Sequence, residues 1–248
     1  MYVRDVGSGP PVLVLHGCPS TGEMVAPIQK ALQDSHRVLV PDLPGYGASP
    51  PPETYSLKAV REGLLKILDE RDIESLSIVG HSNGSYRALD LALHTDLNIE
   101  KLVLLGALAH LPEEMKEEFP QFATALRDGV DLEDAVVERW IAPDFRAAHP
   151  EFEEQMRTWW REMDNEVIAD DLDAAVTMPD LRPRLEELEV PAYVRVGSLD
   201  LATPPELSEE IVERLPEATL DIVDGVGHFV HIEDREKTGK KLADFLTN

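Results

Sequence analysis

The segment Gly80-His81-Ser82-Asn83-Gly84 decides the fold, because this G-x-S-x-G pattern joins a strand-like segment to a helix-like one. An unbroken apolar run, Leu76–Val79, comes before it, and a helix-sized segment, Gly84–His94, follows it. Where a strand turns sharply into a helix, glycines on both sides of the turn let the backbone segments approach closely without Cβ clashes. The pattern therefore predicts that Ser82 lies on a sharp, strained strand-to-helix turn.

The rest of the chain continues this alternation of short apolar runs and helix-sized segments. Unbroken apolar runs are typical of strands buried on both faces, and their alternation with helices predicts β-α-β units. The expected strands are Val12–Leu15, Arg37–Val40, Leu76–Val79, Leu102–Leu105, Tyr193–Gly197 and Thr219–Val223. The expected helices are Gly22–Gln33, Ser56–Glu70, Gly84–His94, Pro205–Leu215 and Asp234–Phe245. The sequence thus predicts an α/β fold with a doubly wound, mostly parallel sheet.

The alternation stops between about residues 110 and 178. No strand-like run occurs there, and apolar residues such as Leu132, Val136 and Trp140 recur at the spacing of an amphipathic helix. We therefore expect a helical cap over residues 110–178, inserted into a core domain of residues 1–109 and 179–248.

The serine of the turn requires partners, because a hydroxyl is a weak nucleophile until a base takes its proton. A histidine oriented by a carboxylate serves this purpose, in the chain order serine, acid, histidine. Asp200 and His228 each follow a predicted strand, and the carboxyl ends of parallel strands are where such sheets place their sites. Ser82, Asp200 and His228 are therefore the candidate catalytic residues. The rival acids are Asp221 and Asp224, and the rival base is His231.

Backbone N–H groups near Ser82 are candidates to stabilise a developing oxyanion. Asn83 would supply one at the start of the helix. Cys18 would supply the second from the loop His16-Gly17-Cys18-Pro19, since Pro19 has no N–H. The Cys18 thiol is expected to be buried and inert, with its side chain pointing away from the oxyanion site. His16 and His81 are expected to hold loops by hydrogen bonding.

Three tryptophans of the cap, Trp140, Trp159 and Trp160, are candidate substrate-binding residues. Each is also suited to the hydrophobic core of the cap. Trp159 and Trp160 are adjacent, so they cannot both point the same way on a helix.

Composition limits the partners that the chain can have. It has 248 residues, of which 43% are hydrophobic, and a formal net charge of −25. Nucleic acid and anionic membrane surfaces would repel so acidic a protein. Cys18 is the single cysteine, so neither an intrachain disulfide nor a thiolate zinc cluster can form.

No segment is suited to a membrane or to export. The longest apolar run, Leu102–Ala109, is far shorter than the ~20 residues of a membrane helix. Residues Met1–Asp5 lack the basic and then apolar pattern of a signal peptide. We expect a soluble, cytoplasmic monomer or homodimer that binds a small-molecule substrate, uses no cofactor or metal, and binds neither nucleic acid nor membrane.

Taken together, these motifs resemble the α/β-hydrolase fold superfamily from Tyr2 to Leu246. Within it, the chain is most similar to 3-oxoadipate enol-lactonase-like serine hydrolases. The segments that carry this second resemblance are Arg139–Arg146, His149–Glu151, Leu181–Leu185 and Asp200–Pro205. The resemblance implies that Ser82 is the nucleophile, Asp200 the acid and His228 the base, with Cys18 and Asn83 as the oxyanion hole. Ser85 departs from the second glycine that such lactonases often have, and the superfamily's first edge strand is expected to be absent or very short.

These features predict a serine hydrolase that cleaves a carboxylic ester or lactone through an acyl-enzyme. Two alternatives use the same fold: a C–C bond hydrolase or perhydrolase on the same triad, and a ligand receptor with slow turnover. The cap offers Arg139, Arg146, Arg157 and Arg161 to an anionic substrate, but acidic residues surround them. We expect these arginines to pair with neighbours at i±4, and uncharged substrates to be preferred.

Overall fold

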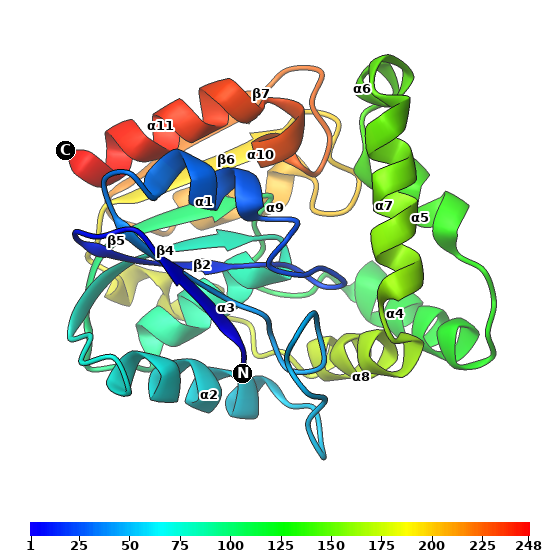
Figure 1. Ribbon diagram of the computed structural model, residues 1–248, viewed down its shortest axis with the longest axis horizontal. Coiled ribbons are helices and arrows are strands. Elements are labelled where there is room, and N and C mark those ends of the chain that lie inside the picture. Colours follow the sequence, from blue (N-terminus) through cyan, green and yellow to red (C-terminus); the bar gives the residue numbers. More distant parts are fainter.

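The computed structural model describes residues 1–248 and contains one seven-stranded sheet with helices on both faces (Figure 1). The strands lie in the order β1-β3-β2-β4-β5-β6-β7. Strands β2 to β7 are parallel, and β1 pairs antiparallel with β3 at one edge. The strands are β1 (Val3–Val6), β2 (Pro11–Leu15), β3 (Arg37–Pro41), β4 (Ser75–His81), β5 (Asn98–Leu105), β6 (Ala192–Gly197) and β7 (Ala218–Val223).

The central strands are buried on both faces, and their side chains alternate between two hydrophobic cores. In β2, Val12 and Val14 belong to one core, and Leu13 and Leu15 to the other. Figure 1 shows α1 (Ala26–Leu32) with α11 (Arg235–Thr247) on one face of the sheet, and α2 (Leu57–Asp69) with α3 (Asn83–Leu93) on the other. Helix α9 (Pro205–Val212) packs into the core that contains α2 and α3. Burial on both faces explains why the central strand segments are mainly apolar.

Five α-helices lie between β5 and β6, and they gather beyond one end of the strands (Figure 1). They are α4 (Glu113–Arg127), α5 (Glu133–Trp140), α6 (Pro143–Ala148), α7 (Pro150–Glu162) and α8 (Asn165–Val176). Helix α7 is tied to α5 through the Glu133 carboxylate, which accepts hydrogen bonds from Arg157 (2.9 Å) and Arg161 (2.7 and 2.8 Å). We refer to these five helices as the cap.

The α/β fold with a mostly parallel sheet is confirmed, and the differences from expectation are local. Strand β5 begins at Asn98 rather than Leu102, because its first residues pair with β4 while alternating between exposed and buried. Helix α1 begins at Ala26 rather than Gly22, because the Gly22 N–H is held by the Asp42 carboxylate (2.9 Å). The first edge strand, expected to be absent or very short, is the four-residue β1.

Two short helices were not anticipated: the 3₁₀ helix η1 (Arg182–Glu187) and α10 (Val230–Glu233). Each spans fewer residues than the helical pattern needs in order to be seen in a sequence. No helix of the structure is both long enough and apolar enough to cross a membrane.

Candidate active site

Ser82 lies between β4 and α3 in a backbone conformation that few residues other than glycine adopt. Its φ and ψ are 55° and −129°, so the turn stores strain. The flanking glycines are required by close packing. A Cβ on Gly80 would overlap the Gly84 carbonyl oxygen, and a Cβ on Gly84 would overlap the Leu15 carbonyl oxygen in β2. The strained turn expected from the sequence is therefore present.

Ser85 replaces the second glycine expected in a lactonase-like turn, and it makes hydrogen bonds of its own. Its hydroxyl donates to the Ser82 carbonyl (2.6 Å) and accepts from the Leu108 N–H (3.3 Å). The residue is fully buried. Ser85 thus links the turn that carries Ser82 to the segment that follows β5.

Asp200 and His228 meet where β6 and β7 end. Nδ1 of His228 donates to Oδ2 of Asp200 (2.8 Å), and both residues are buried. The other carboxylate oxygen, Oδ1, accepts from the N–H groups of Ala202 (2.9 Å) and Thr203 (2.8 Å). These bonds fix the carboxylate, and the carboxylate in turn fixes which imidazole nitrogen carries the proton.

Thr203 is a member of this cluster that the sequence analysis missed. Its hydroxyl donates to Oδ2 of Asp200 (3.0 Å) and lies 3.2 Å from Nδ1 of His228. In an Asx-type turn an aspartate accepts hydrogen bonds from N–H groups two or three residues later. Such a turn after Asp200 was the signal in the sequence that could have indicated Thr203.

The rival residues lie outside this cluster. Asp221 pairs with Arg195 and Lys241, and Asp224 is within hydrogen-bonding reach only of Ser198 (3.4 Å). Nε2 of His231 donates to the Met24 carbonyl (3.1 Å) instead of facing a carboxylate. Of the candidate pairs, Asp200 and His228 are the two that the structure brings together.

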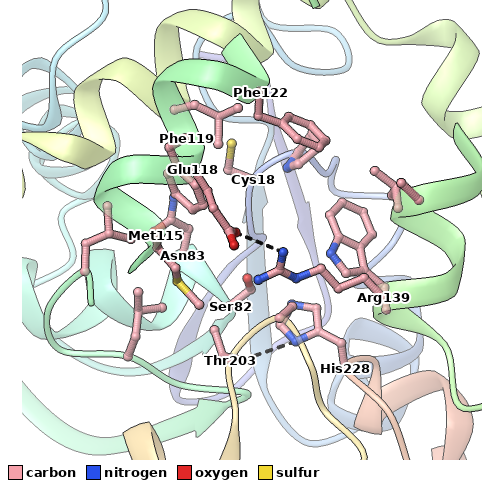
Figure 2. A pocket seen from close by; sticks show the side chains of 18 residues that line it. Cys18, Ser82, Asn83, Met115, Glu118, Phe119, Phe122, Arg139, Thr203 and His228 are labelled. Carbon is pink, nitrogen blue, oxygen red and sulfur yellow. Dashed lines mark hydrogen bonds and ion pairs between the residues drawn. The ribbon is translucent and has the colours of Figure 1, made fainter. Parts of the chain in front are cut away.

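Ser82 and His228 both line a cavity of about 200 Å³ between the sheet and the cap (Figure 2). Eighteen residues line it, and eleven of them are hydrophobic. Helix α4 contributes Met115 and Phe119, and Thr203 lies beside His228 at the base. Such a cavity, largely apolar with a few convergent polar groups, is the usual form of a small-molecule site.

The two expected oxyanion donors lie at the same cavity. Asn83 is the first residue of α3, so its N–H has no acceptor within the helix. The N–H of Cys18 donates to no other group of the protein, and both residues line the cavity. Neither N–H is taken by an acceptor within the protein, so the oxyanion role of the two groups stays a prediction.

His16 holds the Cys18 loop in place. Nε2 of His16 accepts from the Leu43 N–H (3.0 Å), which leaves Nδ1–H to donate to the Gly17 carbonyl (2.9 Å). Burial lowers the pKa of His16 to about 4, so the ring is neutral near pH 7. His81 also makes a loop contact, donating from Nε2 to the His228 carbonyl (3.1 Å). The expectation that both histidines hold loops agrees with these bonds.

The family model described as "alpha/beta hydrolase fold" matches residues 10–235. The chain belongs to the α/β-hydrolase family. As an α/β hydrolase, it is similar to a thermophilic esterase from Thermogutta terrifontis, with 26% identity, a TM-score of 0.92, and coverage of 99% of this chain and 92% of that one. It is also similar to the enol-lactonase from Burkholderia xenovorans, with 27% identity, a TM-score of 0.90, and coverage of 100% and 96%.

A relative known by its sequence is the 2-hydroxy-6-oxononadienedioate/2-hydroxy-6-oxononatrienedioate hydrolase of Cupriavidus pinatubonensis. It is 26% identical over 266 residues, with coverage of all of this chain and 91% of the relative. The match between these proteins and the present α/β hydrolase thus extends over the cap as well as the core.

In this α/β hydrolase Cys18, which was expected beside the site, is one of the residues that line the cavity. The residue is half-buried, and Sγ is 3.3 Å from the Tyr46 hydroxyl oxygen. Burial raises the pKa of the Cys18 thiol well above its usual value. An inert thiol agrees with the direction of this shift, whereas the expected burial of the residue is only partial.

Only one of the three candidate tryptophans lines the cavity of this α/β hydrolase. Trp140 does, at 6.3 Å between ring centres from His228. Trp160 packs edge-on behind Trp140 and against Phe122, and Trp159 packs edge-on against Phe152. Trp160 is therefore a buried residue of the cap and Trp159 a half-buried one, and neither lines the cavity.

A buried polar network lies under the cavity and was not visible in the sequence. Arg87 of α3 donates from Nη2 to both carboxylate oxygens of Asp171 in α8 (2.5 and 2.8 Å). The Tyr46 hydroxyl donates to the same carboxylate (3.1 Å) and contacts Cys18. Arg87 is 4% exposed and Asp171 is fully buried. The ion pair thus connects the helix after Ser82 to the cap.

The cap arginines of this α/β hydrolase are paired, as expected, but mostly between helices rather than at i±4. Arg157 and Arg161 bind Glu133, 24 and 28 residues away. Arg139 binds Glu118 of α4 (3.1 Å), and Arg146 lies 3.6 Å from Glu153. Arg139 is the arginine that lines the cavity.

Proposed function

We propose that the protein hydrolyses a carboxylic ester or lactone, with Ser82 as nucleophile, His228 as base and Asp200 as the acid that orients it. The observation that carries this proposal is the 2.8 Å contact between Asp200 and His228, beside a serine on a strained turn in the same cavity. A histidine held in one tautomer by a carboxylate can take the proton of a nearby serine.

The steps follow from the positions of these groups. Ser82 Oγ attacks the substrate carbonyl carbon, and its proton passes to Nε2 of His228. The N–H groups of Cys18 and Asn83 stabilise the oxyanion. His228 then gives the proton to the leaving alcohol, leaving an acyl-enzyme on Ser82. Water, activated by the same histidine, releases the acid and restores the serine. With a lactone the alcohol stays attached to the acyl group.

Similar proteins support an ester or lactone as the substrate. One is an esterase and another an enol-lactonase, at 26% and 27% identity over almost the whole chain. The apolar cavity wall suits an uncharged acyl or alcohol group.

The test is steady-state turnover of a panel of aryl esters and lactones by the wild type and by Ser82→Ala. The proposal expects turnover that is lost in the variant. Reaction with a 4-nitrophenyl phosphate triester, at one equivalent of 4-nitrophenol per chain, would report the Ser82 nucleophile independently of the substrate. A wild type that turns over neither esters nor lactones and does not release this equivalent would contradict the proposal.

A second candidate function is C–C bond hydrolysis on the same three residues. The observation that favours it is the 26% identity to the oxononadienedioate hydrolase. A panel that includes a vinylogous 1,5-diketone separates the two reactions. Faster cleavage of the diketone than of any ester or lactone would assign the C–C reaction instead. Perhydrolysis is tested by adding hydrogen peroxide to the ester assay and measuring the peracid formed. A receptor with slow turnover would bind the substrate without multiple turnovers.

A further inference from the structure

The lining of the cavity that holds Ser82 contains one carboxylate and one guanidinium, those of Glu118 and Arg139. Glu118 of α4 and Arg139 of α5 reach toward each other across the space above Ser82 and His228 (Figure 2). Oε2 of Glu118 accepts from Nη1 of Arg139 (3.1 Å), and Nε of Arg139 donates to the Leu201 carbonyl (3.1 Å). The pair thus joins two cap helices to the loop that follows Asp200.

The same pair lines a second hollow on its outer side. This outer groove is more open, has a volume of about 310 Å³, and shares Met115, Glu118 and Arg139 with the catalytic cavity. Because the two spaces meet at these side chains, a substrate that enters from the groove passes the ion pair before it reaches Ser82.

The charges around this passage are unfavourable to an anion. The groove is lined by three carboxylates, those of Glu114, Glu118 and Glu206, and by one guanidinium, that of Arg139. Arg139 is the only arginine or lysine on the wall of either space, and its guanidinium is already paired with the Glu118 carboxylate. A carboxylate at the mouth would therefore meet a net negative environment with no free cation.

The pair of Glu118 and Arg139 is also exposed enough that either side chain can be replaced. The side chain of Glu118 is 56% exposed and that of Arg139 is 43% exposed, and such pairs contribute little to folding stability. Removing the Glu118 charge should therefore leave the fold intact and free a guanidinium that can bind a carboxylate in bidentate geometry.

We propose that Glu118 determines the charge specificity of the site: by occupying Arg139, it makes the protein select uncharged esters or lactones over those that carry a carboxylate. This proposal rests on the proposed function, because it concerns which substrates reach Ser82. Glu118 acts on specificity and takes no part in the chemical steps.

The experiment compares two esters with acyl chains of equal length, 4-nitrophenyl pentanoate and mono-4-nitrophenyl glutarate. The measured quantity is the ratio of kcat/KM for the anionic ester to that for the neutral ester. The wild type should favour the neutral ester. In Glu118→Gln the ratio should rise about tenfold, the order expected when a charge-assisted hydrogen bond becomes available to the substrate. The gain should be absent from Arg139→Gln and lost in the double variant.

Glu114→Gln is the matched control. Glu114 lies one turn before Glu118 on the same helix, lines the same groove and has no ion-pair partner. The Glu114→Gln substitution removes one negative charge from the groove without freeing the Arg139 guanidinium. If Glu114→Gln raises the ratio as much as Glu118→Gln, a general field rather than the pair sets specificity, and the proposal is overturned. A wild type that prefers the glutarate ester, or an unchanged ratio in Glu118→Gln, overturns it as well.

A binding measurement separates this proposal from the proposed function. In a Ser82→Ala background, quenching of tryptophan fluorescence, to which Trp140 in the cavity wall contributes, reports binding of either ester without turnover. Tighter binding of the glutarate ester after Glu118→Gln supports the role of the pair even if Ser82 proves not to be the nucleophile. If Glu118→Gln leaves binding of the glutarate ester unchanged while the enzyme hydrolyses the neutral ester, the role of Glu118 is contradicted and the proposed function is not.

Discussion

At the scale of single residues, His228 and His231 differ in their partners more than in their positions. His228 bonds to a buried carboxylate, whereas His231 bonds to the Met24 carbonyl. We therefore predict that Ser82→Ala and His228→Ala each lower kcat by ~10⁴–10⁶, as in other serine triads, and that His231→Ala has a mild effect. The measurement is kcat on the best aryl ester. An equal loss in His231→Ala would show that the base has been misassigned.

Cys18 gives a second prediction at this scale. Its thiol lines the cavity, yet burial raises its pKa, so the reactive thiolate is scarce near pH 7. Iodoacetamide should modify it slowly compared with a free cysteine, and Cys18→Ala should retain activity, because the oxyanion donor is the backbone N–H. Mass spectrometry follows the modification. Rapid inactivation by iodoacetamide that disappears in Cys18→Ala would refute the inert thiol.

At the scale of elements, the Arg87–Asp171 pair fastens α8 to α3. Both side chains are buried, and Nε and Nη1 of Arg87 have no hydrogen-bond partner. Loss of the carboxylate charge would leave the guanidinium unpaired in a dry environment, which costs about 3–5 kcal/mol. We predict that Asp171→Asn lowers the free energy of unfolding by about 3 kcal/mol, as measured by urea denaturation.

The control for this prediction replaces both partners by apolar residues. Arg87→Met with Asp171→Leu should be more stable than Asp171→Asn alone, because no buried charge is left unpaired. If Asp171→Asn unfolds at the wild-type urea concentration, the pair does not hold the cap to the core.

The elements also show which features local sequence can reveal. The strands were predictable because the central strands are largely buried on both faces, so each contains a run of mainly apolar residues. The Ser82 turn was predictable because its glycines are needed by the backbone itself. Asp171 was not, since its partner Arg87 lies 84 residues away and depends on how α8 docks. That Trp159 and Trp160 lie away from the cavity could not be predicted for the same reason. A helical pattern indicates which face of a helix is buried but not which part of the protein that face contacts.

At the scale of the whole molecule, three buried histidines make stability depend on pH. Burial lowers the pKa of His16 to about 4 and that of His231 to about 3, and it lowers the pKa of His81 well below its usual value. In the unfolded chain these groups titrate near 6.5. Above that pH both states are neutral and this contribution to stability is complete. As pH falls through 6.5 the unfolded chain takes up protons that the folded chain refuses, so stability decreases.

We therefore predict that Tm falls between pH 7 and pH 5, before most carboxylates are protonated. Calorimetry across this range gives the slope. His231→Gln should make the slope shallower, whereas His149→Gln, which changes an exposed histidine, should leave it unchanged. A Tm that is constant over this range would contradict a buried neutral state for these rings.

The close packing around Ser82 has a consequence for how the protein can diversify. Any side chain on Gly80 or Gly84 meets backbone atoms of another segment, and backbone cannot turn aside as a side chain can. In a randomised library these positions should tolerate no substitution, and no single change elsewhere would compensate. The cap helices α4 and α5 line the same cavity without this restriction. New substrate preferences should therefore arise by mutation in the cap, while the turn is inherited unaltered.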